Sequence, residues 1–256
     1  MTAKPEGEQR KLTDRAERRD PPSIELFSLL GVAVREGKNV GLYGLPMIGK
    51  SVLASILARE FAGEGVAVVF GTEDHYADED YRRLIASFLP RNHYINYCRN
   101  VEEVFRYLNI VEAKQFEGRL ALILDSFSAL ANVEASELSA RGVKETRVKV
   151  SRVTPMVNEV ATRFKRVVAE KRALGITVMH ASSMAGAGKF RGIADWKPVM
   201  SARVAHSLDY LVLMTAEKAD LETPRTLTLV ASRLTPSDEG RTVRFRFRER
   251  TVEVVA

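Results

Sequence analysis

A glycine-rich octapeptide, GLPMIGKS at residues 44–51, constrains the possible folds of this chain more than any other feature. It fits the pattern G-x-x-x-x-G-K-[ST], with an apolar segment, Asn39–Tyr43, before it and an alanine-rich helical stretch, Ser51–Ala62, that follows. Glycines let backbone N–H groups converge on phosphate oxygens, and the start of a helix adds partial positive charge. The pattern therefore predicts a strand, a phosphate-binding loop and a helix, in that order.

This loop predicts a role for each of its polar residues. Lys50 is expected to reach the β- and γ-phosphates of ATP, and Ser51 is expected to ligate Mg²⁺. The residues predicted to bind the nucleotide are Gly44, Leu45, Pro46, Met47, Ile48, Gly49, Lys50, Ser51 and Val52.

Two carboxylates are expected beside the loop. The apolar strand Leu120–Asp125 ends in an acid, and an acid at the carboxyl end of a neighbouring strand suits a second magnesium-holding group. Asp125 is therefore predicted to bind the metal and the nucleotide. Glu73 follows the predicted strand Gly65–Phe70, where a carboxylate can face the γ-phosphate and polarise an attacking water. The residues alone leave open that Glu73 is a surface acid in an acidic loop.

Apolar runs alternate with helical stretches along most of the chain, which indicates right-handed crossovers and a mostly parallel sheet. Beyond Leu208 the apolar runs follow one another closely, which predicts antiparallel strands at one edge of that sheet. The predicted helices are Ile24–Arg35, Lys50–Ala62, Asp78–Phe88, Val101–Val111 and Pro155–Leu174. The predicted strands are Asn39–Tyr43, Gly65–Phe70, Tyr94–Tyr97, Leu120–Asp125, Ile176–His180, Tyr210–Met214, Leu227–Ser232, Val243–Arg248 and Val252–Val255.

Composition and charge narrow the class of protein. Residues 1–20 are polar and predict a disordered charged tail, whereas residues 21–256 predict one ATPase domain. No apolar run is long enough for a membrane span. The single cysteine, Cys98, excludes an internal disulfide framework and a cysteine-rich zinc site, and favours the cytoplasm. A net charge of +6 is compatible with a polyanionic partner.

Several segments together resemble the RecA/RadA recombinases. They are Thr72–Tyr76 with Arg82-Arg83-Leu84, Asp125–Leu130, and Lys197–Met200 through His206-Ser207. The resemblance runs from about Ser23 to the C-terminus. It implies an α/β fold of RecA-like, three-layer type with antiparallel C-terminal strands, Mg²⁺ and ATP as cofactors, and Glu73 as the residue that activates the hydrolytic water.

Other members of the same superfamily match locally. Met179–Ser182 with Ala185–Gly188 is similar to RepA-like hexameric helicases, and Val230–Arg233 resembles a strand of DnaB-like and KaiC-like ATPases. The second resemblance implies that Arg233 reaches the γ-phosphate of a neighbouring subunit; otherwise it is an exposed strand arginine. Recombinases usually carry Gln or Asn as a polar switch where this chain has His180 or Ser182. A buried, hydrogen-bonded structural histidine is the alternative for His180.

Two stretches, Asn132–Thr154 and Met184–Lys197, are predicted to be irregular. The corresponding loops bind single-stranded DNA in RecA-like proteins, and basic residues on a flexible backbone suit phosphate contacts. The candidate DNA-binding residues are Arg141, Lys144, Arg147, Lys189 and Arg191. A solvated helix face is the alternative for the first group.

The sequence thus predicts a Mg-dependent ATPase that acts on DNA in recombination or repair. Its expected partners are single-stranded DNA and either further copies of itself, in a ring or filament, or a partner recombinase. A short charged tail in place of a helix-hairpin-helix domain favours a recombinase paralogue. The alternatives are a hexameric DNA helicase of RepA or DnaB type, a KaiC-like regulatory ATP-binding protein without a DNA response, and, most distantly, a P-loop small-molecule kinase.

Overall fold

The computed structural model describes residues 23–140, 142, 146–183, 196–198, 202–218 and 222–255. The predicted tail, residues 1–20, lies outside this range. The helices are α1 (Ser23–Leu29), α2 (Lys50–Ala62), α3 (Glu79–Ala86), α4 (Val101–Ala113), α5 (Phe127–Ala140), α6 (Thr146–Glu170) and α7 (Ala202–Ala205), with the 3-10 helices η1 (Asp74–Ala77) and η3 (Pro236–Asp238). The strands are β1 (Asn39–Gly44), β2 (Val66–Gly71), β3 (Asn92–Tyr97), β4 (Leu120–Asp125), β5 (Leu174–Ser183), β6 (Trp196–Pro198), β7 (Tyr210–Ala216), β8 (Arg225–Ser232), β9 (Thr242–Arg248) and β10 (Thr251–Val254).

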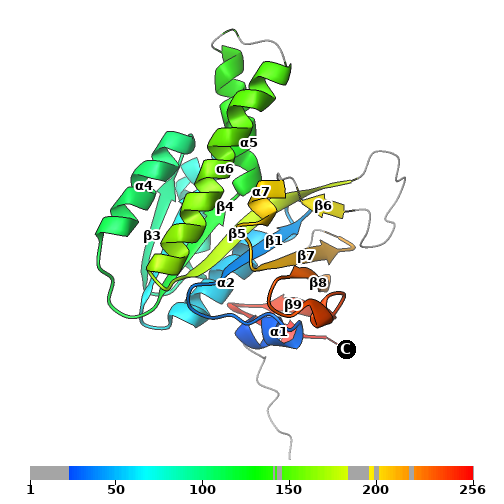
Figure 1. Cartoon of the computed structure of the whole chain (residues 1–256). Helices are drawn as coiled ribbons and strands as arrows, with labels where there is room; N and C mark the ends of the chain where they lie inside the picture. Colours follow the sequence, from blue (N-terminus) through cyan, green and yellow to red (C-terminus); the bar gives the residue numbers. More distant parts are fainter. Residues whose placement is uncertain are drawn as a thin grey trace, which may run out of the picture.

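The described strands form one sheet in the order β10-β9-β8-β7-β1-β5-β4-β2-β3, with β6 paired to β5 (Figure 1). From β7 to β3 every neighbouring pair is parallel. Strands β8, β9 and β10 continue the sheet antiparallel to one another. The predicted fold class, a mostly parallel sheet with antiparallel C-terminal strands, is therefore confirmed.

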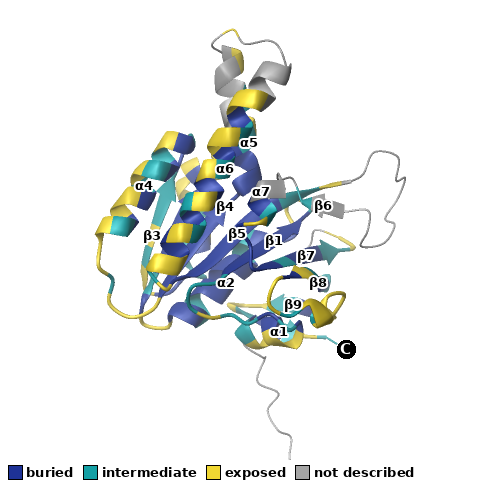
Figure 2. Ribbon diagram, viewed as in Figure 1, coloured by how far each residue is buried: buried dark blue, intermediate teal, exposed yellow. Residues whose placement is uncertain are grey.

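Alternate residues of the central strands pack into two hydrophobic cores, one on each face of the sheet. In β4, Ala121 and Ile123 belong to the core that includes buried residues of α1 and α2, whereas Leu122 and Leu124 belong to the core that includes α4 and α6. Strands β1 and β4 are dark blue along their length in Figure 2, as expected for strands covered on both faces, whereas the outer strand β3 is mostly teal. This arrangement produces three layers, with β1 near the middle of the sheet.

Two predicted boundaries were wrong around the long helix. Residues 132–154 were predicted to be irregular, but those that the structure describes lie in α5 or α6, except Gly142, which is a turn residue between the two helices, and α6 continues through Pro155. Val153, Val157 and Val160 are buried on one face of α6, so packing outweighs the backbone hydrogen bond that proline cannot make. The two helices stand together above the sheet in Figure 1.

Two smaller differences occur, one in the first helix and one just before α7. The first helix ends at Leu29 instead of Arg35, and Gly31 follows it with a φ of 79°, a left-handed conformation that favours glycine. The last two residues of the second stretch predicted to be irregular, Trp196 and Lys197, belong to β6, which pairs antiparallel with β5. Within the described part of the chain, no helix combines the length and the apolar character needed to cross a membrane.

Tyr210 at the start of β7 offers a direct test of this core. Its side chain is 1% exposed, and its hydroxyl has no hydrogen-bond partner among the described residues. A buried polar group without a partner costs about 1–3 kcal/mol. We expect Tyr210→Phe to raise the free energy of unfolding by about 1 kcal/mol, measured by urea denaturation. Tyr97→Phe, which removes a hydroxyl bonded to Asp74, is the control and should give no gain. A loss of stability in Tyr210→Phe would contradict the prediction.

Candidate functional site

The segment from Gly44 to Ser51 connects the end of β1 to the start of α2, as predicted. Gly49 caps α2 with a φ of 95°, and a Cβ there would lie 2.6 Å from the Phe247 ring. A Cβ on Gly44 would lie 2.2 Å from the Met214 carbonyl oxygen. Both positions therefore require glycine, because a side chain would push the turn away from β7 and β9.

Lys50 is a buried cation in the first turn of α2. Its side chain is 6% exposed, and its Nζ donates a hydrogen bond of 2.5 Å to the Leu45 carbonyl oxygen. Burial lowers the pKa of Lys50 from 10.5 to about 8, although the charges of Asp125 and Glu73 act in the opposite direction. The charges of Asp125 and Glu73 thus offset the cost of burying the ammonium only in part. The ammonium lies against the turn, where it contacts Leu45.

Asp125 lies at the carboxyl end of β4 and is 2% exposed. Burial raises its pKa above the usual range, while hydrogen bonds from Ser51 and Tyr76 and the charge of Lys50 oppose that rise. The Tyr76 hydroxyl donates to Asp125 Oδ2 over 2.5 Å. The peptide bond from Asp125 to Ser126 is cis. Ser51 therefore lies near the acid that ends β4, a strand separated from β1 by β5.

Glu73 follows β2 and belongs to a network of three side chains. His180 Nε2 lies 2.9 Å from Glu73 Oε1, and the Ser126 hydroxyl donates to the same oxygen. Burial favours the neutral form of Glu73, but the hydrogen bonds from His180 and Ser126 and the charges of His180 and His75 outweigh it, so its pKa is lowered. Glu73 is therefore a half-buried, oriented carboxylate rather than an acid free in solvent.

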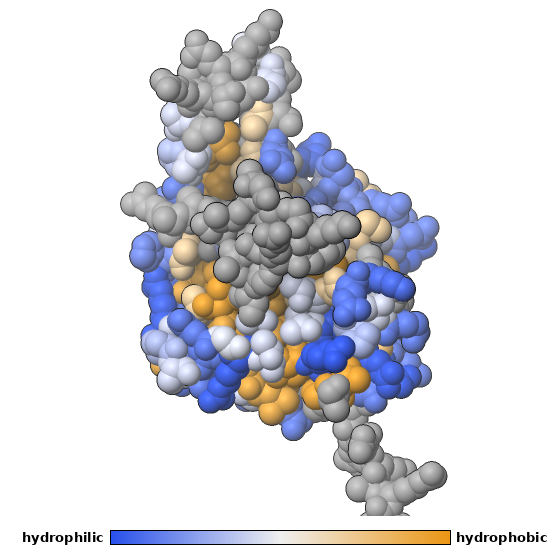
Figure 3. All heavy atoms as spheres, turned by 90° about the vertical axis from the view of Figure 1, so that its right-hand side faces the viewer, coloured by the Kyte–Doolittle hydropathy of each residue, from blue (hydrophilic) through white to orange (hydrophobic). Residues whose placement is uncertain are grey.

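Backbone contacts hold the three strand ends of this site together. The Thr72 N–H donates to the Asp125 carbonyl oxygen over 2.7 Å, and the Thr72 hydroxyl donates to the Ser126 carbonyl oxygen over 2.6 Å. On the other side, the His180 N–H donates to the Ser128 hydroxyl over 2.9 Å. The ends of β2, β4 and β5 are thereby tied into one rigid platform. Figure 3 views the side on which β1, β5 and β7 end, where hydrophobic and hydrophilic surface lie side by side.

Four residues near this site were missed by sequence reasoning. Tyr76 and Tyr81 have ring centroids 5.1 Å apart, and Tyr81 is hydrogen-bonded to both Ser51 and Tyr76. Arg225 is 1% exposed on β8, and its Nε donates to the Ile48 carbonyl oxygen over 3.2 Å. Its guanidinium also lies 5.1 Å from the ring centre of Phe247. Tyr76 and Tyr81 follow Glu73 closely in the sequence, which could have suggested that they lie near the site. Nothing in the sequence indicated that Arg225 and Phe247, far along the chain, would lie there.

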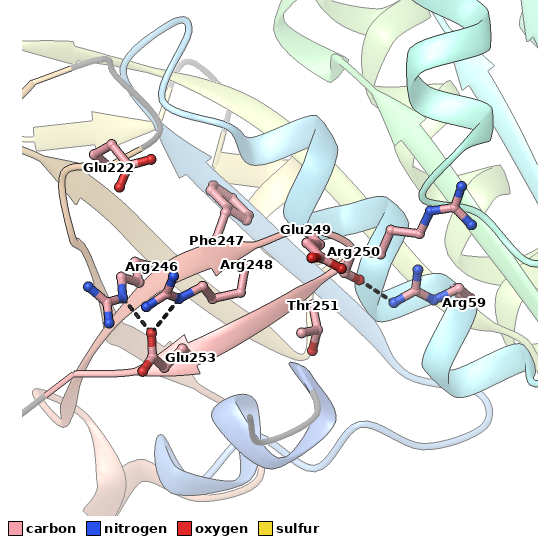
Figure 4. Close-up of a pocket in the computed structure, with 9 residues that line it drawn as sticks. All are labelled: Arg59, Glu222, Arg246, Phe247, Arg248, Glu249, Arg250, Thr251 and Glu253. Carbon is pink, nitrogen blue, oxygen red and sulfur yellow. Dashed lines mark hydrogen bonds and ion pairs between the residues drawn. The ribbon is translucent and has the colours of Figure 1, made fainter. Parts of the chain in front are cut away.

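A cavity of about 670 Å³ opens beside the hairpin of β9 and β10 (Figure 4). Arginines and glutamates line it, and Glu253 accepts hydrogen bonds from both Arg246 and Arg248. Phe247 is the lining residue that also contacts the Gly49 turn. None of the converging groups at the strand ends lines this cavity, so it borders the candidate site without containing its carboxylates.

Other predicted residues are not brought to this site. β8 runs antiparallel to β7. Arg233, just beyond β8, therefore lies at the end of the sheet where β1 and β7 begin, whereas Gly44 lies at the end where they finish. Its guanidinium is within 2.8 Å of His206 Nδ1. Four of the candidate DNA-binding residues lie outside the described residues: Arg141, Lys144, Lys189 and Arg191. The backbone of Arg147 is in α6, but its side chain is also outside the description.

The chemistry of the donor set fits ATP with Mg²⁺. No cluster of three or more His, Cys, Asp or Glu side chains suited to a metal occurs among the described residues. Ser51 and Asp125 offer a hydroxyl and a carboxylate, which are hard oxygen ligands. Mg²⁺ is typically held by one or two such groups together with waters and substrate phosphates, rather than by an all-protein cage. The buried ammonium of Lys50 supplies a counter-charge for phosphates.

The sheet order and the strand–turn–helix at its centre define a fold, the RecA-like α/β fold. No protein-family model matches the chain, and no curated protein does. Among solved structures, the chain is similar to the crystal structure of the RadB recombinase, with a TM-score of 0.60 and 18% sequence identity. The match covers 90% of this chain and 96% of that one. At this identity the likeness establishes the shared fold, and the predicted RecA-like architecture is confirmed.

The buried charge of Lys50 is expected to lower the stability of the folded chain at neutral pH. Between pH 8 and 10.5 the unfolded chain binds a proton that folded Lys50 has lost, so stability rises with pH across that window. Below it, the buried ammonium is destabilising. We expect Lys50→Met to raise the free energy of unfolding of the nucleotide-free chain at neutral pH by roughly 1–3 kcal/mol.

This gain should shrink as the pH rises through the same window, because folded wild-type Lys50 loses its buried charge near pH 8 while the unfolded chain stays protonated up to about pH 10.5. Urea denaturation of the two proteins at a series of pH values measures it. Lys38→Met, a change outside the turn, is the control and should give no such dependence. An equal or lower stability of Lys50→Met at neutral pH would contradict the prediction.

Proposed function

We propose that this chain is a Mg-dependent ATPase that acts on DNA in recombination or repair, in the manner of a recombinase paralogue. One observation carries the proposal: Lys50, Ser51, Asp125 and Glu73 converge at the carboxyl edge of a sheet with RecA-like topology. Ligands of open α/β sheets bind at that edge. The Gly44–Val52 segment is the proposed nucleotide-binding loop.

Lys50 and the turn above it would bind the phosphates. In the present structure the ammonium donates to a backbone carbonyl, Leu45 O. Phosphate oxygens are stronger acceptors because they are charged, so they would replace that carbonyl as partners. Ser51 and Asp125 would hold Mg²⁺, which neutralises charge on the phosphates when it is bound.

Glu73 would orient and polarise the attacking water. Its lowered pKa keeps it ionised at neutral pH, so it can accept a hydrogen bond from water. His180 and Ser126 hold its carboxylate in place, which supports His180 rather than Ser182 as the switch residue. Arg233 lies at the opposite edge of the sheet, so we propose that it acts on the site of a neighbouring subunit.

The proposed partners are single-stranded DNA and further copies of this chain or a partner recombinase. The net charge of +6 and the basic residues at 141–152 and 189–197 support a polyanionic partner. The similarity to a solved recombinase supports recombination over the helicase and regulatory alternatives. A single cysteine, buried as Cys98, supports a cytoplasmic location.

The first test compares ATP hydrolysis with and without single-stranded DNA in the wild type and in Lys50→Ala. We expect DNA to stimulate turnover in the wild type, and turnover to be lost in the variant because the phosphates lose their buried counter-charge. ATP binding with slow turnover that ignores DNA would instead favour the regulatory alternative. Directional unwinding of duplex DNA would favour a helicase.

A second prediction separates binding from hydrolysis. Glu73→Gln keeps the size of the side chain but removes the charge that polarises water, so hydrolysis should fall by about 100-fold or more while ATP affinity changes little. Single-turnover hydrolysis and equilibrium binding measure the two effects. Glu79→Gln is the matched control, since Glu79 is an exposed acid in the same segment. Normal hydrolysis by Glu73→Gln would show that another group activates the water.

A further inference from the structure

Tyr76 occupies a position that the fold has shaped around its ring. A Cβ on Gly71, the last residue of β2, would lie 2.3 Å from Tyr76 Cγ, so only glycine leaves room for the ring there. The side chain is 1% exposed. The backbone of Tyr76 is held on both sides: its N–H donates to the Glu73 carbonyl oxygen over 2.9 Å, and its carbonyl accepts from Arg82 over 2.6 Å.

This placement holds the Tyr76 hydroxyl beside the Asp125 carboxylate. The hydroxyl donates to Asp125 Oδ2 over 2.5 Å, and both side chains are buried. Ser51 also hydrogen-bonds the Asp125 carboxylate, from the loop side. Tyr81 packs edge-on against Tyr76, with the ring planes at 87°, and hydrogen-bonds both Tyr76 and Ser51. Two tyrosine hydroxyls thus join the two groups that the proposed function assigns to the metal.

From this geometry we propose that Tyr76 is a positioning residue for Mg²⁺. Its hydroxyl holds Asp125 Oδ2, which would leave the other carboxylate oxygen available to Mg²⁺ bound beside Ser51. The inference rests on the proposed nucleotide site and adds to it a residue that acts on the metal only through Asp125. A phenylalanine at position 76 would fill the same space but would leave the carboxylate free to rotate and one buried acceptor without its donor.

The inference predicts a specific change in metal dependence. In Tyr76→Phe, the Mg²⁺ concentration for half-maximal binding of a non-hydrolysable ATP analogue should rise about tenfold, the effect of losing one hydrogen bond to a charged group. Binding of the same analogue in excess EDTA should not change, because Lys50 and the turn are intact. Both are measured by calorimetric titration. Tyr97→Phe is the matched control, since its hydroxyl also bonds an aspartate, Asp74, but outside the site.

A double-mutant cycle with Asp125→Asn separates positioning from a general structural role. If Tyr76 acts through Asp125, Tyr76→Phe should have no further effect on Mg²⁺ dependence once Asp125 carries no charge. An equal effect in both backgrounds would overturn the inference, as would an unchanged Mg²⁺ dependence in the single variant. If Tyr76→Phe does not fold, shown by the loss of its unfolding transition, Tyr76 is a core residue and the inference also falls.

The outcomes distinguish this inference from the proposed function. Mg-dependent binding of the analogue by the wild type, with no shift in Tyr76→Phe, would leave the proposed function standing and remove the role of Tyr76. A wild type that binds the analogue equally well with Mg²⁺ and with EDTA would overturn both, because no metal would then be held at Ser51 and Asp125.

Discussion

Parallel pairing of β1, β5, β4 and β2 determines where the candidate nucleotide-binding residues lie. Parallel strands end at the same edge, so Gly44, Asp125 and His180, which are far apart in the sequence, finish side by side. Each of these strands is covered on both faces, and a buried backbone must satisfy its hydrogen bonds within the sheet. The sheet therefore cannot shift its register without exposing a core, and the platform at its edge is rigid for that reason.

Charged side chains are buried where these strands end. Lys50 and Asp125 are both almost fully buried, and burial shifts both pKa values toward the neutral form. Glu73 behaves differently because His180 and Ser126 supply hydrogen bonds that favour its ionised form. Burying these ionisable groups is unfavourable for the stability of the folded protein. Such strain is common at functional sites.

Local pattern predicted the loop and the strand ends well. Gly44–Ser51 needed only its own residues and their flanks, and β4 was recognisable as a buried strand because Leu120–Leu124 has no polar interruption. The region around Pro155 failed because local rules give proline a helix-starting role, whereas the buried valines of α6 carry the helix through it. The contact between Tyr76 and Asp125 was also missed, because Tyr76 lies in η1 and Asp125 follows 49 residues later at the end of β4.

The sequence by itself determined the fold class, the glycine-rich turn and the acids at the strand ends, because each depends on neighbours within a few residues. Only the tertiary structure decided which side chains meet. It brought His180 to Glu73, Tyr76 to Asp125 and Arg225 to the turn, and it placed Arg233 at the opposite edge. These outcomes follow from strand order and direction. Both are set by the packing of the whole sheet, and no local stretch of sequence encodes them.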